Sequence, residues 1–183
     1  MTKGVDDVAV HNFWFKDIGP DKWWTKDRDL DELIKQRFQG IHHRATHCEL
    51  YPWRDTPGGR LAEIIVLDQF SRNIYRGRPE SFANDAQALA LAQAAVDLGT
   101  DKKLNASEKG FLYMPFMHSE SLLIHDIAMQ LFAQKGLENY YRFERQHKVI
   151  IERFGRYPHR NAILGRESTP AEIEYLQQPG SGF

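Results

Sequence analysis

The sequence predicts an all-α fold of seven to nine helices arranged in antiparallel hairpins. Three observations support this. The strand-like alternation of apolar and polar residues is nearly absent, apolar residues recur at helical spacing, and glycine, proline and asparagine separate the periodic segments. The 183 residues, 42% of them hydrophobic and 27% charged, have the size and composition of one globular domain. We therefore expect a single domain over residues 1–183, with the tail 179–183 loosely held.

Two helices are expected before residue 45. The first covers residues 5–15 and is separated from the next by a break at Pro20. Asp27 or Asp29 caps the second, whose apolar residues share one face. The aromatic pair Trp23–Trp24, in the connection between them, is expected to fill the core.

The next two helices differ in their packing. Thr56, followed by Pro57, is a suitable cap for a third helix over residues 60–73. This helix is apolar around most of its circumference, so we expect it to be buried. The fourth helix, over residues 85–98, is rich in alanine, which permits close packing, and Gly99 suits its C-terminal end.

The second half of the chain contains two capping-box patterns. The first, at Asn105–Glu108, opens a fifth helix that should end before Pro115. A sixth helix is expected over residues 116–134 and a seventh over 137–154. The second box, at Thr169–Glu172, opens a last short helix.

Composition excludes several classes of protein. The 24 lysines and arginines are balanced by 25 aspartates and glutamates, so charge gives no indication of a nucleic-acid partner. The one cysteine, Cys48, excludes an internal disulfide and a cysteine-rich zinc site. No apolar run approaches the ~20 residues that span a bilayer, and residues 1–7 lack the apolar core of a signal peptide. His43 and His47 have metal-ligand spacing, but no third ligand is evident. We expect a cytoplasmic protein without membrane contact, metal or cofactor, and its oligomeric state stays open.

Ionisable side chains fall on the apolar faces of three predicted helices. At 100° per residue, Asp68 and Arg72 both lie on the apolar side of the third helix, four residues apart. Glu120 lies in the middle of the apolar face of the sixth helix, and His147 in that of the seventh. A buried charge must pair, bind a ligand or become neutral. We therefore expect these four side chains to meet in one cluster, which is either a functional site or a structural polar core.

A basic segment follows directly. Residues 142–166 contain seven lysines and arginines against two glutamates. Within it, a turn presents Arg156, His159, Arg160 and Asn161, and guanidinium groups match carboxylate or phosphate with two hydrogen bonds. We interpret this turn as part of an anion site, although some of its arginines should only satisfy helix C-terminal carbonyls.

Several separated motifs resemble one bacterial family, the domain of unknown function family 924. They are Leu67–Asn73, Met114–Glu120, His147 and Arg153–Arg166 followed by Ser168–Thr169, in the same order along the chain. The resemblance covers residues 13–176. It implies an all-helical fold similar to a tetratricopeptide-repeat domain, stacked with a right-handed twist, and it implies no activity.

The family's motif residues map onto this chain at many of the positions already singled out. They are Asp68, Gln69, Arg72, Asn73, His118, Ser119, Glu120, His147, Arg153, Gly155, Arg156, Pro158, His159, Arg160, Asn161, Gly165 and Arg166. Two positions depart from the family pattern: Ser71 stands where proline is usual, and His125 stands where glutamine is expected, at the rim of the site.

The leading interpretation is a buried site for a small molecule that carries a carboxylate or phosphate, with enzymatic activity left open. The candidates for acid–base chemistry are Glu120, His147, Asp68 and His159, because a buried carboxylate beside a histidine suits proton transfer. The candidate ligand-binding residues are Arg72, Asn73, His118, Arg153, Arg156, Arg160, Asn161 and Arg166. The alternative is a non-catalytic helical-repeat module that binds an acidic peptide, with a purely structural polar cluster.

Overall fold

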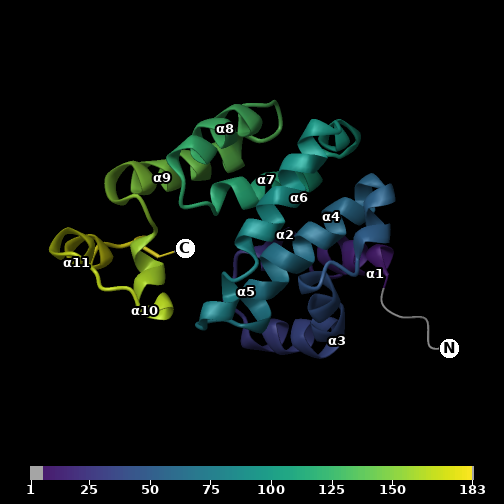
Figure 1. The fold of residues 1–183 in the computed structure, drawn as a ribbon, viewed down its shortest axis with the longest axis horizontal. Helices are drawn as coiled ribbons and strands as arrows, with labels where there is room; N and C mark the ends of the chain where they lie inside the picture. The colour runs from purple at the N-terminus through teal and green to yellow at the C-terminus, as the bar shows by residue number, and fades with distance from the viewer. Residues whose placement is uncertain (1–5, 183) are drawn as a thin grey trace.

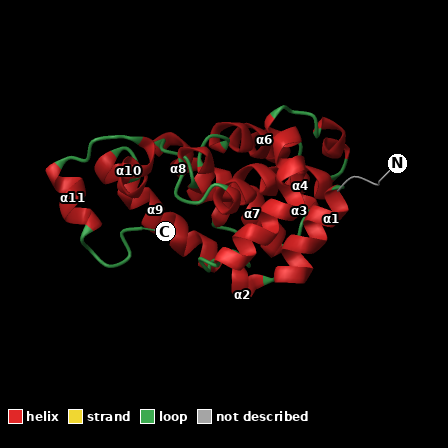
Figure 2. Cartoon of the chain, turned by 90° about the horizontal axis from the view of Figure 1, so that it is seen from below, coloured by secondary structure: helices red, strands yellow, loops and turns green. Residues whose placement is uncertain are grey.

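The computed structural model describes residues 6–182, and every regular element in that range is helical (Figure 2), which confirms the all-α prediction. The α-helices are α1 (Asp7–Asn12), α2 (Pro20–Trp23), α3 (Arg28–Thr46), α4 (Pro57–Ile65), α5 (Ser71–Ile74), α6 (Asp85–Asp97), α7 (Ala106–Met117), α8 (Leu122–Phe132), α9 (Glu138–Phe154), α10 (Asn161–Leu164) and α11 (Pro170–Leu176). The π-helical turns are Phe13–Ile18 and Val66–Phe70, and the 3-10 turns are Tyr51–Asp55, Pro79–Ser81, Thr100–Lys103 and Pro158–Arg160. No helix within the described range is both long and apolar enough to span a bilayer.

Helices from α6 to α9 pack against their neighbours in the chain, whereas those before α6 also pack on helices further along it. α1 packs on α4, α3 on α5, α6 on both α4 and α7, α7 on α8, and α8 on α9. α1 and α3 lie at one end of the molecule, while α10 and α11 lie at the opposite end (Figures 1 and 2). A stack of the tetratricopeptide-repeat kind stays a prediction.

Side-chain caps begin the helices where the sequence predicts them. Asp27 accepts hydrogen bonds from the backbone N–H groups of the first turn of α3, and Thr56 accepts one from Gly59 at the start of α4. Capping boxes are formed at Asn105 and at Thr169. Each cap satisfies backbone N–H groups that have no partner within the helix.

The predicted boundary between the fifth and sixth helices is wrong. α7 continues through Pro115 to Met117, the chain leaves the helix over residues 118–121, and α8 begins only at Leu122. Proline removes one helical hydrogen bond, but all eight residues from Gly110 to Met117 are buried. Their packing outweighs the lost bond, as tertiary context often outweighs local propensity.

Two predicted helices contain π-helical turns. The helix predicted over residues 5–15 is α1 followed directly by the first π turn, and Val5 lies outside the described residues. The helix predicted over 60–73 begins at Pro57 and is interrupted by the π turn Val66–Phe70. Side chains beyond each turn are therefore rotated away from the positions that 100° steps assign.

The main hydrophobic core is rich in aromatic side chains. Phe13, Trp14, Phe38 and Phe70 are buried within it and lie against one another. A second, smaller cluster lies under α9 and is centred on Tyr157. Side chains of both clusters line the pocket described below.

We predict opposite effects for two helical glycines. A Cβ at Gly110 of α7 would lie 2.3 Å from Cζ of Tyr140, whereas a Cβ at Gly40 of α3 would meet nothing within 4 Å. Gly110→Ala should lower the free energy of unfolding by about 1–3 kcal/mol, because overpacking displaces the tyrosine ring. Gly40→Ala should raise it by about 0.5–1 kcal/mol, because alanine is the better helix former. Urea unfolding measures both. A Gly110→Ala protein as stable as Gly40→Ala would contradict the packing of α7 on α9.

Candidate functional site

A pocket of about 600 Å³ opens between the two hydrophobic clusters. Its walls come from the segment 23–26, from α5, α7 and α9, and from the chain around α10. Four cationic side chains, three histidines and several aromatic rings line it, and no aspartate or glutamate is among its lining residues within the described range. The lining cations are Lys26, Arg72, Arg76 and Arg160, and the histidines are His118, His147 and His159.

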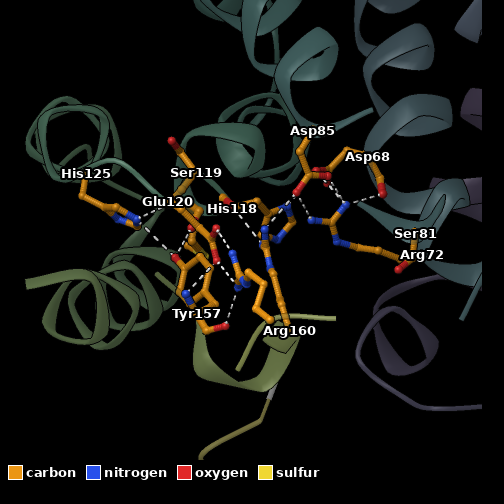
Figure 3. Close-up of polar contacts among 12 residues, drawn as sticks. Asp68, Arg72, Ser81, Asp85, His118, Ser119, Glu120, His125, Tyr157 and Arg160 are labelled. Carbon is orange, nitrogen blue, oxygen red and sulfur yellow. Dashed lines mark hydrogen bonds and ion pairs between the residues drawn. The ribbon is translucent and has the colours of Figure 1, made fainter. Parts of the chain in front are cut away.

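Arg72 of α5 is held from behind by two carboxylates. It donates two hydrogen bonds to Asp85, of 2.9 and 3.0 Å, and one of 2.8 Å to the backbone oxygen of Asp68. Nη1 of Arg72 lies 3.3 Å from Oδ1 of Asp68, so the predicted pair of Asp68 and Arg72 is present (Figure 3). These contacts fix the guanidinium before any ligand arrives.

Arg160, in the second half of the chain, bonds the Asp85 carboxylate as well. Its Nη1 donates to Oδ2 of Asp85 at 3.2 Å, and its Nη2 donates to the backbone oxygen of His118 at 3.0 Å. The guanidinium lies between the rings of Phe82 and Tyr157, 4.6 Å from each centroid. Stacking between two rings holds its plane in one orientation.

Asp68 supports His118 from beneath the pocket. The carboxylate is 1% exposed, and its Oδ1 lies 2.7 Å from Nδ1 of His118 (Figure 3). Gln69 donates a 2.6 Å bond to Oδ2. Burial by itself would raise the pKa of Asp68, but Arg72 and His118 outweigh burial and hold that pKa well below its usual range. Because the ionised carboxylate can only accept, Nδ1 of His118 carries the ring proton.

The three pocket histidines are neutral at neutral pH. Burial and the neighbouring Arg72 lower the pKa of His118, although Asp68 partly opposes them. Burial lowers the pKa of His147 to about 3, and burial together with Arg160 lowers that of His159 to about 4. The positive charge of the pocket therefore comes from its arginines and lysine.

Glu120 lies behind the pocket wall, in the loop between α7 and α8, and not on a helix face as predicted. It accepts two hydrogen bonds from Arg166, of 2.7 and 2.9 Å, and one of 2.7 Å from the backbone N–H of Tyr157. Burial acts to raise its pKa, but these donors outweigh burial and lower it. Glu120 thus positions the chain that carries Tyr157.

His125 belongs to the core and not to the rim where the family pattern puts it. Its Nδ1 lies 2.6 Å from Glu144, with both side chains fully buried, and its Nε2 lies 2.8 Å from the backbone oxygen of Ser119. The Tyr157 hydroxyl donates to the backbone oxygen of Met117 and lies 3.2 Å from the same Nε2. These contacts join α8, α9 and the loop 118–121 behind the pocket.

Four predicted ligand-binding residues lie outside the pocket lining. Arg156 bonds Glu172 at 2.7 and 2.8 Å, and Arg153 is exposed over the ring of Phe154. Arg166 bonds Glu120, and it also bonds Asn161, which is itself buried. The expected contact with a helix C-terminal carbonyl is made instead by Arg160, which bonds the backbone oxygen of His118 at the end of α7.

Asn73 and Arg76 lie on the pocket lining and share one partner on α3. Asn73 donates a 2.8 Å bond to Asp31, and Arg76 donates two to the same carboxylate, at 2.5 and 2.7 Å. Asn73 was predicted, whereas Arg76 was not. The two arginines that follow Asn73 closely, Arg76 and Arg78, were the available signal for Arg76.

Sequence reasoning missed several aromatic residues of the pocket. Trp23 packs against the main core as predicted and also lines the pocket, whereas Trp24 lines the pocket and is 60% exposed. Lys26, two residues after the pair, was the available signal, because aromatic and cationic side chains together are typical of ligand sites. Asp85, which joins the two arginines, gave no signal beyond its place at the start of a helix.

Among residues 6–182, no three histidine, cysteine or acidic side chains are grouped so as to hold a metal ion. His42 bonds the Ser71 hydroxyl at 2.8 Å inside the core, and the rings of His43 and His47 stack with centroids 4.3 Å apart.

The fold and the site define a class of all-α proteins with a cationic, aromatic-walled pocket between helices. The chain belongs to the family described as "Bacterial protein of unknown function (DUF924)", whose model matches residues 10–180. A solved structure of a protein of unknown function from Agrobacterium tumefaciens is similar, with 37% identity and a TM-score of 0.87 over 93% of this chain and 96% of that one. A search of curated proteins gives no match.

We predict that stability falls in acid because of the pocket histidines. A folded pKa of about 3 for His147 and about 4 for His159 means that the unfolded chain takes up protons first, below its ordinary histidine pKa of about 6.5. Stability should be level above that value and fall by up to about 1.4 kcal/mol per pH unit per histidine as the pH drops toward 4.

Urea unfolding at several pH values, compared with a His147→Gln variant, measures the effect. In the variant, the free energy of unfolding should fall less steeply with decreasing pH, by about the contribution of one histidine. The carboxylates contribute equally to both proteins, so their effect cancels in the comparison. Identical slopes for the two proteins would show that folding does not lower the pKa of His147.

Proposed function

We propose that the protein binds a small organic anion, a carboxylate or a phosphate, in the pocket between α5, α7 and α9. The observation that carries the proposal is the composition of the lining, which holds four cations and no acid within the described range. The acids that balance Arg72 and Arg160 are not among the residues of the lining, whereas both arginines are. Charge-assisted hydrogen bonds to such groups are among the strong ones.

Three properties of Arg160 support the proposal that an anion binds beside it. It is buried, and its Nε has no hydrogen-bond acceptor among the described residues, which is unusual for a buried donor. Burial and the neighbouring Arg72 lower its pKa, and an added negative charge would relieve this repulsion. Its plane is already fixed between two rings, so binding costs little side-chain entropy.

The rest of the pocket suits an apolar or aromatic body on the ligand. Trp23, Trp24, Tyr140 and Phe143 line it, together with Met114 and Met117. A volume of about 600 Å³ falls within the range typical of small-molecule sites. A cytoplasmic location is part of this proposal.

A shallower groove favours the alternative function, binding of an acidic peptide. It lies between α9 and the segment from Tyr175 to Gly180, and two arginines, Arg142 and Arg145, line it beside the exposed Val149. A peptide would use this open surface, whereas a small molecule would use the deeper pocket.

We predict that Arg160→Gln weakens binding of 3-phenylpropanoate about 10- to 100-fold, because one charge-assisted contact contributes about 1.5–3 kcal/mol. Arg156→Gln is the matched control, since Arg156 lies on the same segment but bonds Glu172 outside the pocket. Titration calorimetry measures both, and 3-phenylpropanamide tests whether charge is required.

The remaining arms of this experiment separate the ligand classes. Phenyl phosphate in place of the carboxylate distinguishes the two anions. Binding of the neutral amide as tight as that of the acid, or equal losses in Arg160→Gln and Arg156→Gln, would contradict the proposal. A poly-glutamate peptide whose binding needs Arg142 and Arg145 would favour the groove.

A further inference from the structure

We propose that His118 is the proton-accepting group of the pocket and that the protein catalyses removal of a proton from the carbon next to the keto group of a bound 2-oxo acid. The inference rests on the proposed anion site and adds a reaction and a substrate class to it. It also moves the acid–base role from Glu120, which is outside the pocket lining, to a histidine that lines it.

The His118–Asp68 pair has the geometry of a base and the carboxylate that orients it. Nδ1 bonds the buried Oδ1 at 2.7 Å, and Gln69 and Arg72 hold the same carboxylate, so the imidazole cannot turn freely. No hydrogen bond joins Nε2 to another of residues 6–182, and the ring lines the pocket. With its proton on Nδ1, the ring presents the Nε2 lone pair to the ligand space. Asp68 is the positioning residue here, and His118 the catalytic one.

Burial, together with Arg72, favours the unprotonated ring of His118. The charged and titratable groups around it come from four different segments and are Asp68, Arg72, Asp85, His147, His159 and Arg160. Burial and Arg72 lower the pKa of His118 more than the two aspartates raise it. His118 is therefore ready to accept a proton at neutral pH, as a general base must be.

The two arginines beside His118 match the two negative centres of an enolate. Arg72 and Arg160 bond the same oxygen, Oδ2 of Asp85, so their guanidinium groups are neighbours. One can hold the carboxylate of a 2-oxo acid, and the other the keto oxygen, where charge appears as the proton leaves.

The step is balanced without any further reactant. The C3–H bond breaks, its proton goes to Nε2, and its electron pair forms the C2–C3 double bond. The keto π pair moves onto the oxygen beside the second guanidinium. Return of a proton from Nε2 to C3 regenerates the keto acid or leaves it exchanged with solvent, and nothing is oxidised or reduced.

The test uses 2-oxo-4-phenylbutanoate in D₂O, with the two C3 protons followed by ¹H NMR. The wild-type protein should replace them with deuterium faster than buffer alone. His118→Gln should bind the probe within a few-fold of wild type but lose at least about 100-fold in exchange rate, the usual contribution of a general base. His47→Gln is the matched control, because that histidine is exposed on α3's C-terminal end, and it should exchange like wild type.

The pH dependence of the exchange rate separates a catalytic role of His118 from a structural one. The exchange rate should rise with pH and level off, with a midpoint below the ordinary histidine pKa of about 6.5. Asp68→Asn removes a charge that raises the pKa of His118, so the midpoint should move to lower pH and the rate should fall. If Asp68→Asn does not fold, long-range ¹H–¹⁵N spectra of the wild type carry this part of the test, and they should show the proton of His118 on Nδ1.

The outcomes separate the two proposals. A probe that binds through Arg160 but is not exchanged, or is exchanged equally by His118→Gln, overturns the role of His118 and leaves the anion site standing. The same holds if His118 carries its proton on Nε2. Failure of the wild type to bind the probe or 3-phenylpropanoate overturns the anion site, and the proton transfer with it.

Discussion

The carboxylate of Asp85 connects the two halves of the chain. It lies at the first position of α6, and it binds Arg72 from the first half of the chain and Arg160 from the second. Two guanidinium groups in one partly buried place repel each other unless an anion lies between them. The position of α10 relative to α5, and with it the width of the pocket, therefore depends on this shared carboxylate. Removing one charge from such a network leaves the others unbalanced, so its members are expected to be coupled in their effects.

Other polar residues of the lining are also held by acids that lie outside it. Asp68 holds His118, Asp31 holds Asn73 and Arg76, and each acid is turned away from the ligand space. As a result, the pocket presents cations and neutral histidines to a ligand although the whole chain is nearly neutral. Fixed donors in a partly buried site cost little reorganisation when a ligand arrives, and this is what binding and catalysis both require.

The sequence was sufficient for most of the fold because the relevant signals are local. The caps at Asp27, Thr56, Asn105 and Thr169, and the ends of α6 and α9, depend on neighbouring residues only. The break at residues 118–121 was not predictable in this way, because it depends on burial of α7 through Pro115, which is a tertiary effect.

The site was predictable in part for the same reason. Helical spacing puts Asp68 and His147 against the core, and they do lie beneath the pocket and on its lining. Arg72 also reaches the lining, although the π turn before it changes the helical phase. The partners of the arginines could not be read from spacing, since Arg156 and Arg160 are chemically alike and differ only in whether Glu172 or Asp85 is near. Distinguishing them requires the three-dimensional arrangement.

The π-helical turn over Val66–Phe70 has a consequence for how the pocket arose. Such a turn accommodates one residue more than an α-helix does over the same hydrogen-bonded span. An α-helix without the extra residue would carry Arg72 at nearly the same place, whereas the present number of residues wound as an α-helix would rotate Arg72 by about 100°, away from Asp85. The pairing of Arg72 with Asp85 therefore depends on a turn that takes up one extra residue.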